Sequence, residues 1–143
     1  IITASEDKSI KFWCLKTLKE IKSIPHAHQY RIMTMTYVEK KQMLITGDNG
    51  GHLYYWDIWK GTCIKKMKDQ CAIRSIVVPG GLKYTITANS RGEIIIKDFL
   101  SGNIIKTIKE AYNGGLSCSI CEIPKSNMIV SCWEKSLKSF WFQ

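Results

Sequence analysis

The residues of this chain that could do chemistry are three histidines, six cysteines and twelve carboxylates. His26 and His28 stand two residues apart, and Cys118 and Cys121 have the CxxC spacing that occurs in zinc sites. On a strand, however, positions i and i+3 point to opposite faces. No second cysteine pair and no nearby histidine completes a set of four ligands. The spacing therefore predicts cysteine thiols without a bound metal.

The carboxylates are dispersed along the chain, and most stand in predicted turns, whereas an enzyme needs several groups at one concave place. Gly47, Gly50 and Gly51 are turn glycines without a following helix, so they do not form a phosphate-binding loop. No serine nucleophile motif is present either. The sequence predicts no catalytic site, no cofactor and no metal, and it directs the question of function to the surface.

A repeat in the sequence predicts the strands that position these residues. An apolar anchor recurs at Ile2, Ile45, Ile86 and Ile129, with separations of 43, 41 and 43 residues. A fixed period of this length indicates one supersecondary unit used several times. Each complete unit has four short runs of β-branched and aromatic residues separated by turn residues, and no stretch has a helical period. The predicted class is all-β, with four antiparallel strands in each unit.

The second unit has a histidine before its first strand, a threonine in its second strand and a Trp-Asp pair at the end of its third. The first unit keeps the tryptophan of this pair, and the third keeps the aspartate but has Lys97 in place of the tryptophan. In these residues the chain resembles the WD-repeat β-propeller family over its whole length. The resemblance implies blades of four strands in a propeller that most often has seven blades. The matching residues are Trp13, His28, Thr46, Trp56, Asp57 and Asp98.

The resemblance also implies a hydrogen-bonded set inside a blade. Its members are the histidine, the threonine, the tryptophan and an acid in the turn between the second and third strands. In the second unit that turn position is Gly50, with Asp48 and Asn49 nearby. We therefore expect that no unit has the complete set.

At about 42 residues a blade, the chain holds roughly 3.4 blades. The predicted division is 1–24 as the end of a blade, 25–68 and 69–109 as full blades, and 110–143 as the start of another. We expect the chain to be a segment of a larger propeller, whose remaining blades lie outside these residues.

The net charge is +9, and 18 of the 21 basic residues are lysines. Many lysines lie on or near the predicted fourth strands, which are the outermost strands of a blade. One interpretation is attraction to an acidic partner such as RNA, the acidic tails of filaments or an anionic lipid. The other is that lysines protect an exposed edge strand from pairing. This basic rim consists of Lys19, Lys22, Lys65, Lys66, Lys68, Lys106 and Lys109.

In the family that the chain resembles, partners often dock on the face formed by the loops before the first strands and the turns between the second and third strands. Tyrosine, tryptophan and arginine are the residues most often found as interface hot spots. Trp133, in a predicted turn, either anchors a partner or packs on the adjacent blade. The candidate partner-binding residues are Tyr30, Arg31, Asp48, Asn49, Arg74, Arg91, Tyr112 and Trp133.

A repeat architecture without a catalytic cluster predicts a non-catalytic protein–protein interaction scaffold within a multi-subunit assembly. The alternative is a subunit of a ribonucleoprotein or of a microtubule- or cytoskeleton-bound complex, held by the basic rim. No run of 18 apolar residues occurs, so no membrane span is predicted. Scattered cysteines predict an intracellular protein, either nuclear or cytoplasmic, the latter including the cytoskeleton and the cilium.

Overall fold

The computed structural model describes residues 1–80, 82–109, 118–124, 126, 128–133 and 136–141. Within these residues the chain folds into four antiparallel sheets and one short 3₁₀ turn, η1 (Glu39–Lys41). The predicted all-β class is therefore confirmed. Consecutive strands are hydrogen-bonded neighbours in every sheet, so each sheet is a simple up-and-down meander.

The strands have the following bounds. The first sheet holds β1 (Ile2–Ala4), β2 (Ile10–Trp13) and β3 (Glu20–Ile24). The second holds β4 (Ile32–Val38), β5 (Met43–Asp48), β6 (His52–Asp57) and β7 (Thr62–Lys68). The third holds β8 (Ile73–Val77), β9 (Tyr84–Asn89), β10 (Ile94–Asp98) and β11 (Ile104–Ile108). The fourth holds β12 (Ser119–Ile123), β13 (Met128–Trp133) and β14 (Ser136–Trp141). Trp133 thus ends a strand, and its predicted place in a turn was wrong.

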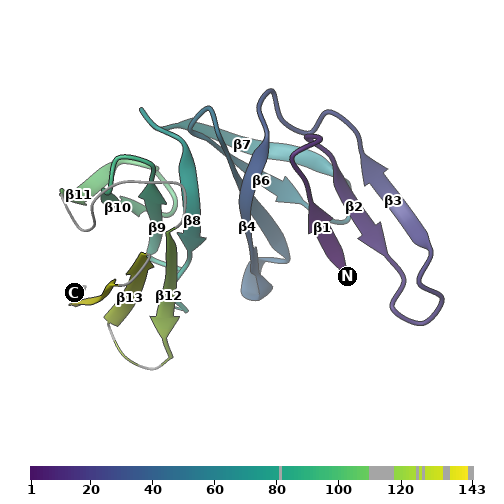
Figure 1. The fold of residues 1–143 in the computed structure, drawn as a ribbon. Helices are drawn as coiled ribbons and strands as arrows, with labels where there is room; N and C mark the ends of the chain where they lie inside the picture. The colour runs from purple at the N-terminus through teal and green to yellow at the C-terminus, as the bar shows by residue number, and fades with distance from the viewer. Residues whose placement is uncertain (81, 110–117, 125, 127, 134–135, 142–143) are drawn as a thin grey trace.

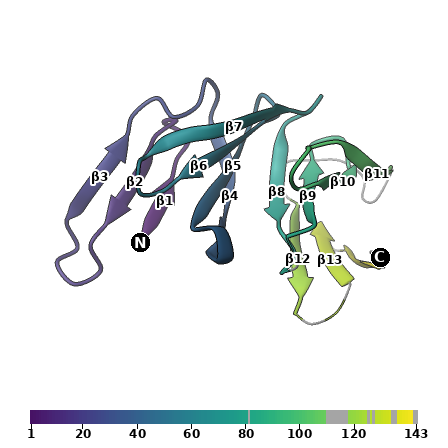
Figure 2. The same ribbon diagram turned by 180° about the vertical axis from the view of Figure 1, so that it is seen from behind.

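The four sheets follow one another in chain order, and successive sheets lie side by side (Figures 1 and 2). β4 packs on β8, β8 packs on β12, and β1 packs on β4. Strands near the start of each sheet therefore meet along one side of the molecule, while β3, β7 and β11 form the opposite edge of their sheets. This radial order places the loops before β4 and β8 close together.

The apolar core lies between the sheets, because each strand sends alternate side chains to its two neighbours. Leu44 of β5 belongs to the cluster between the first and second sheets, whereas the adjacent Ile45 belongs to the cluster between the second and third. A third cluster, which includes Ile86 and Ile129, joins the third and fourth sheets. Each sheet therefore depends on its neighbours for the burial of its apolar side chains.

Two rim lysines also connect successive sheets. Lys22 of β3 donates to the carbonyl oxygen of Trp59, in the turn between β6 and β7 of the second sheet, with an Nζ–O distance of 3.1 Å. Lys65 of β7 makes the same contact in the third sheet, 2.6 Å from the carbonyl oxygen of Leu100. Lys106 has the same register in β11 as Lys65 has in β7, since it pairs with the equivalent residue of the adjacent strand. Part of the basic rim therefore stabilises the packing of sheets.

In each of the first three sheets, the turn before the last strand has one residue in the left-handed region. In the second and third sheets this residue is a glycine, Gly61 with φ +71° and Gly102 with φ +80°. In the first sheet it is Leu18, with φ +56°. A leucine is strained at such a φ because of its Cβ atom.

Within the described residues, no helix has the length and apolar character needed to span a membrane.

Candidate functional site

A buried hydrogen-bonded set lies beneath the loops at one end of the second sheet. Thr46 Oγ1 accepts a hydrogen bond from Trp56 Nε1 at 2.8 Å and lies 2.6 Å from His28 Nε2. His28 Nδ1 lies 2.9 Å from Asp48 Oδ2. The expectation that no unit carries the complete set was wrong. The acid is Asp48, the last residue of β5, and not the residue at the Gly50 position.

Asp48 also fixes the turn that follows it. Its Oδ1 accepts the backbone N–H groups of Gly50 and His52, both at 2.9 Å. Burial alone would raise the pKa of Asp48, but the hydrogen bonds from His28 and from the backbone of His52, with the nearby histidine charges, outweigh it and lower the pKa. The Asp48 side chain is completely buried. Its prediction as a partner contact was therefore wrong, because no partner can reach it.

Five aromatic rings, two of which belong to this hydrogen-bonded set, pack on one another. His28 stacks on Tyr54 with a centroid separation of 4.1 Å, and Tyr30 stacks on His52 at 5.5 Å. Tyr54 connects the two pairs, since it also contacts His52 edge-on and lies 5.9 Å from Trp56. Tyr30, a candidate partner residue, is 44% exposed and so caps this cluster from the solvent side.

The third sheet has no aromatic residue at the same five positions. Strand register and loop length place Asp69, Cys71, Glu93, Ile95 and Lys97 where the second sheet has its rings. Asp69 and Lys97 form an ion pair, and both side chains are 3% exposed. Thr87 Oγ1 donates to the Asp69 carboxylate at 3.4 Å, so a charged set replaces the aromatic one. Sequence reasoning noted Lys97 but missed Asp69, although the paired change to opposite charges was a usable signal.

Three of the predicted partner residues meet at one cavity of about 360 Å³. Arg31 precedes β4, Asn49 follows β5, and Arg74 stands at a β-bulge in β8, where the extra residue re-aims its side chain. Arg31 pairs with Glu6 at 3.3 Å. Within the described residues, the Nε atom of Arg74 is buried and has no hydrogen-bond acceptor. Met33, from the equivalent bulge of β4, and Glu6 complete the lining, and sequence reasoning selected neither of them. We call this space the Arg31–Arg74 cavity.

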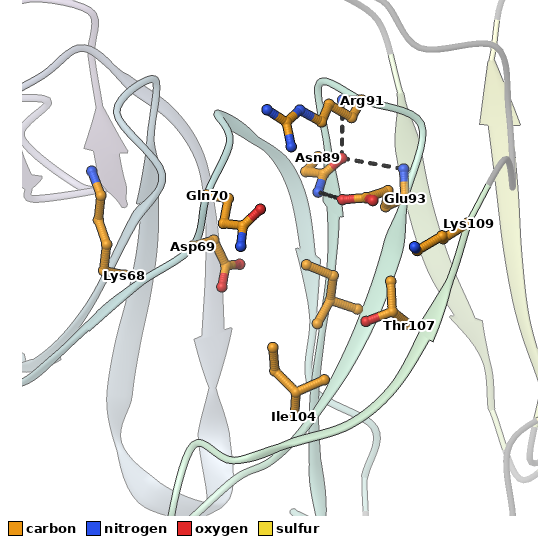
Figure 3. A pocket seen from close by; sticks show the side chains of 10 residues that line it. Lys68, Asp69, Gln70, Asn89, Arg91, Glu93, Ile104, Thr107 and Lys109 are labelled. Atoms are coloured by element: carbon orange, nitrogen blue, oxygen red, sulfur yellow. Dashed lines mark hydrogen bonds between the residues drawn. The ribbon is translucent and has the colours of Figure 1, made fainter.

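A second cavity, of about 470 Å³, opens beside the third sheet. Figure 3 shows Asp69 and Gln70 on one side of it, and Asn89, Arg91, Glu93 and Lys109 on the other. Ile95, Ile104, Thr107 and Lys68 complete its lining. The structure therefore separates Arg91 from Arg31 and Arg74, and it groups Arg91 with the rim residues Lys68 and Lys109. We call this space the Arg91–Lys109 cavity.

Among the described residues, the remaining candidates do not line either cavity. Tyr112 falls outside the described residues, and so does the side chain of Trp133. Lys19 precedes β3, and Lys66 lies over the Tyr54 ring with its Nζ atom 4.7 Å from the ring centroid. Among the described residues, no group of three or more His, Cys, Asp or Glu side chains is arranged to hold a metal ion. The arginine and lysine side chains that line the two cavities can bind acidic groups by hydrogen bonds and charge, and they can attract aromatic rings by cation–π contacts.

Comparisons with known proteins agree with this architecture. The structure matches a crystal structure of the RRP9 WD40 repeats with a TM-score of 0.77 and 13% sequence identity, over 91% of this chain and 40% of that chain. The four sheets therefore have the fold of WD40-repeat propeller blades. In sequence, the chain is 27% identical over 153 residues to Beige protein homolog 1 of Schizosaccharomyces pombe. That match covers 98% of this chain and 5% of the relative. No protein-family profile matches the chain.

Proposed function

We propose that these WD40-repeat blades are a non-catalytic scaffold that docks other proteins within a larger assembly. The docking face is the one that carries the Arg31–Arg74 cavity. It is formed by the turn between β1 and β2, the loop before β4 with the bulge of that strand, the turn after β5 and the bulge of β8, and these segments come from three sheets. Such a face presents directional donors on a rigid framework, which is the arrangement that favours specific recognition.

The observation that carries this proposal is that Arg31 and Arg74 line one cavity, where the Nε atom of Arg74 has no acceptor among the described residues. A buried donor without a partner is unfavourable by about 1–3 kcal/mol, and more when the group is charged. A partner that places a carboxylate or carbonyl oxygen in this cavity supplies an acceptor for the Arg74 guanidinium group. Arg31 is well placed to add a second contact, because its side chain is 66% exposed and its bond to Glu6 is a surface ion pair of small energy.

The test compares the proteins that co-purify with the full-length protein and with its variants. Arg74→Gln and Arg31→Gln remove one guanidinium each and keep a polar side chain. We expect both variants to fold and to lose the same subset of partners. Lys41→Gln, at an exposed residue of η1, is the control and keeps every partner. If both arginine variants retained the full set, this face would not be the docking surface.

A further inference from the structure

The Arg91–Lys109 cavity stands where the second sheet is filled by aromatic rings. Tyr54 pairs with Thr46 in the second sheet, and Ile95 pairs with Thr87 in the third, so Tyr54 and Ile95 are equivalent. Ile95 lines the cavity, and Lys97, the equivalent of Trp56, reaches to its base through the ion pair with Asp69. Loss of the rings leaves a space of about 470 Å³, which is in the range of sites that bind small molecules or single side chains.

The chemistry of the lining favours an occupant that is both aromatic and acidic. Ile95 and Ile104 give it an apolar wall, and Ile104 is 60% exposed and so leaves apolar surface uncovered. The lining also includes the cations Lys68, Arg91 and Lys109. Aromatic rings bury a large area against such a wall, and their faces attract cations.

Two carboxylates line the cavity, and within the described residues one of them is neutralised by a cation. Asp69 is neutralised by the buried Lys97, and Glu93 accepts a hydrogen bond from Asn89 Nδ2 at 2.8 Å. Within the described part of the chain, neither Arg91 nor Lys109 has a carboxylate at ion-pair distance. Lys68 is held in place by the carbonyl oxygen of Gly50, 2.5 Å from its Nζ atom. With three cations against the single uncompensated carboxylate of Glu93, the lining presents net positive charge that a partner can neutralise.

We propose that the Arg91–Lys109 cavity binds an aromatic side chain that a partner protein presents on an acidic segment. The ring enters the space beside Ile95, and the flanking carboxylates contact Arg91 and Lys109. This inference rests on the proposed role as a protein-docking scaffold, but it concerns a surface separate from the Arg31–Arg74 cavity. It gives the third sheet a recognition site where the second sheet has only a structural cluster.

The test uses the full-length protein and a fluorescein-labelled short peptide with a central tyrosine flanked on both sides by glutamates, with binding read as fluorescence anisotropy. A peptide with alanine at the centre and one with glutamines as flanks are the controls. We expect binding only to the first peptide and a lower affinity as salt rises. Equal binding of the alanine peptide would overturn the proposal, because the attraction would then be one of charge alone.

Two kinds of variant place the peptide in the cavity. Ile95→Tyr restores the side chain found in the second sheet, fills the space and is expected to abolish binding. Arg91→Gln, in an exposed turn that folds without it, is expected to weaken binding about fivefold, as the loss of one exposed ion pair does. Lys41→Gln leaves the affinity unchanged. If neither Ile95→Tyr nor Arg91→Gln altered the affinity, the proposal would be wrong. That failure is distinct from a failure of the scaffold proposal, which would appear with Arg31→Gln and Arg74→Gln instead.

Discussion

Asp69 and Lys97 form an ion pair in which both side chains are almost fully withdrawn from solvent. They occupy the positions of His28 and Trp56 of the second sheet, so two blades with the same backbone stabilise the same place by different means. A buried pair offsets its desolvation only while both partners are present.

Replacement of one member of this pair is therefore expected to be severe. Lys97→Met leaves the Asp69 carboxylate buried without its cation, and it should lower the free energy of unfolding by about 3 kcal/mol or more. The double variant Asp69→Leu with Lys97→Met removes both charges, and it should recover most of that loss. Urea unfolding measures both changes. A single variant as stable as the wild type would show that the pair has no role in stability.

Asp48 has two separable functions that two substitutions distinguish. Asp48→Asn keeps an oxygen for the backbone N–H groups of Gly50 and His52, as Asn89 does in the third sheet. It loses the carboxylate that His28 contacts, and we expect a loss of about 1–2 kcal/mol. Asp48→Ala loses both sets of contacts and should cost about 3 kcal/mol or more. The order of unfolding free energies is the measurement, and an alanine variant equal to the asparagine variant would contradict it.

The lowered pKa of Asp48 predicts an acid dependence of stability. Because its folded pKa lies below the ordinary value of 3.8, the unfolded state binds the proton more readily. The stabilisation is complete above that ordinary value, and it is lost as the pH falls through the folded pKa. The difference in unfolding free energy between the wild type and Asp48→Asn should shrink in acid. A difference that grew in acid would show that the sign of the shift is wrong.

Lys65 should stabilise the contact of two sheets through its ammonium group. Lys65→Met keeps the apolar stem but removes the donor to the carbonyl oxygens of Phe99 and Leu100. We expect a decrease of about 1 kcal/mol in the free energy of unfolding, the usual net value of one hydrogen bond. Lys41→Met, on an exposed turn, is the matched control and should have no measurable effect. Equal stability of the two variants would mean that the contact contributes nothing.

Leu18 is the residue whose replacement should stabilise the chain. It adopts φ +56° at a position that is glycine in the next two sheets, and its side chain is 73% exposed, so little packing is lost on truncation. Leu18→Gly relieves about 1–2 kcal/mol of backbone strain, part of which is offset by the greater entropy of the unfolded glycine. We expect a net gain of about 0.5–1 kcal/mol. A lower thermal midpoint for Leu18→Gly would contradict this prediction.

The sequence predicted those parts of the fold that depend on local patterns. The spacing of Ile2, Ile45 and Ile86 and the alternation within each run were sufficient for the sheets, because strand faces and tight turns are set by neighbouring residues. His28, Thr46 and Trp56 were correctly placed in one set. Asp48 was missed as its fourth member, because the place of the acid was assigned by counting along the turn, whereas its contact with His28 depends on where the loop before β4 returns in space.

The contacts between sheets could not be predicted in the same way. Lys22 and Lys65 were assigned to a basic rim from their strand positions, which were correct. Their bonds to the carbonyl oxygens of Trp59 and Leu100 depend on the distance between neighbouring sheets, which no local pattern encodes. The Arg91–Lys109 cavity was missed for a related reason. It arises from the absence of rings at positions far apart in the chain, and only the register between strands brings those positions together.

The placement of apolar residues between sheets also limits how such a chain can change in length. A sheet of this molecule has no apolar core of its own. Leu44 and Ile45 are adjacent in one strand, but Leu44 packs against the first sheet and Ile45 packs against the third. A deletion that removes part of a sheet would expose two half-cores at once. A deletion of one whole repeat would instead remove a sheet together with both of its faces and bring two equivalent sheets together. Viable gains and losses of sequence should therefore come in steps of one complete repeat, while the loops that carry Arg31 and Arg91 remain free to vary residue by residue.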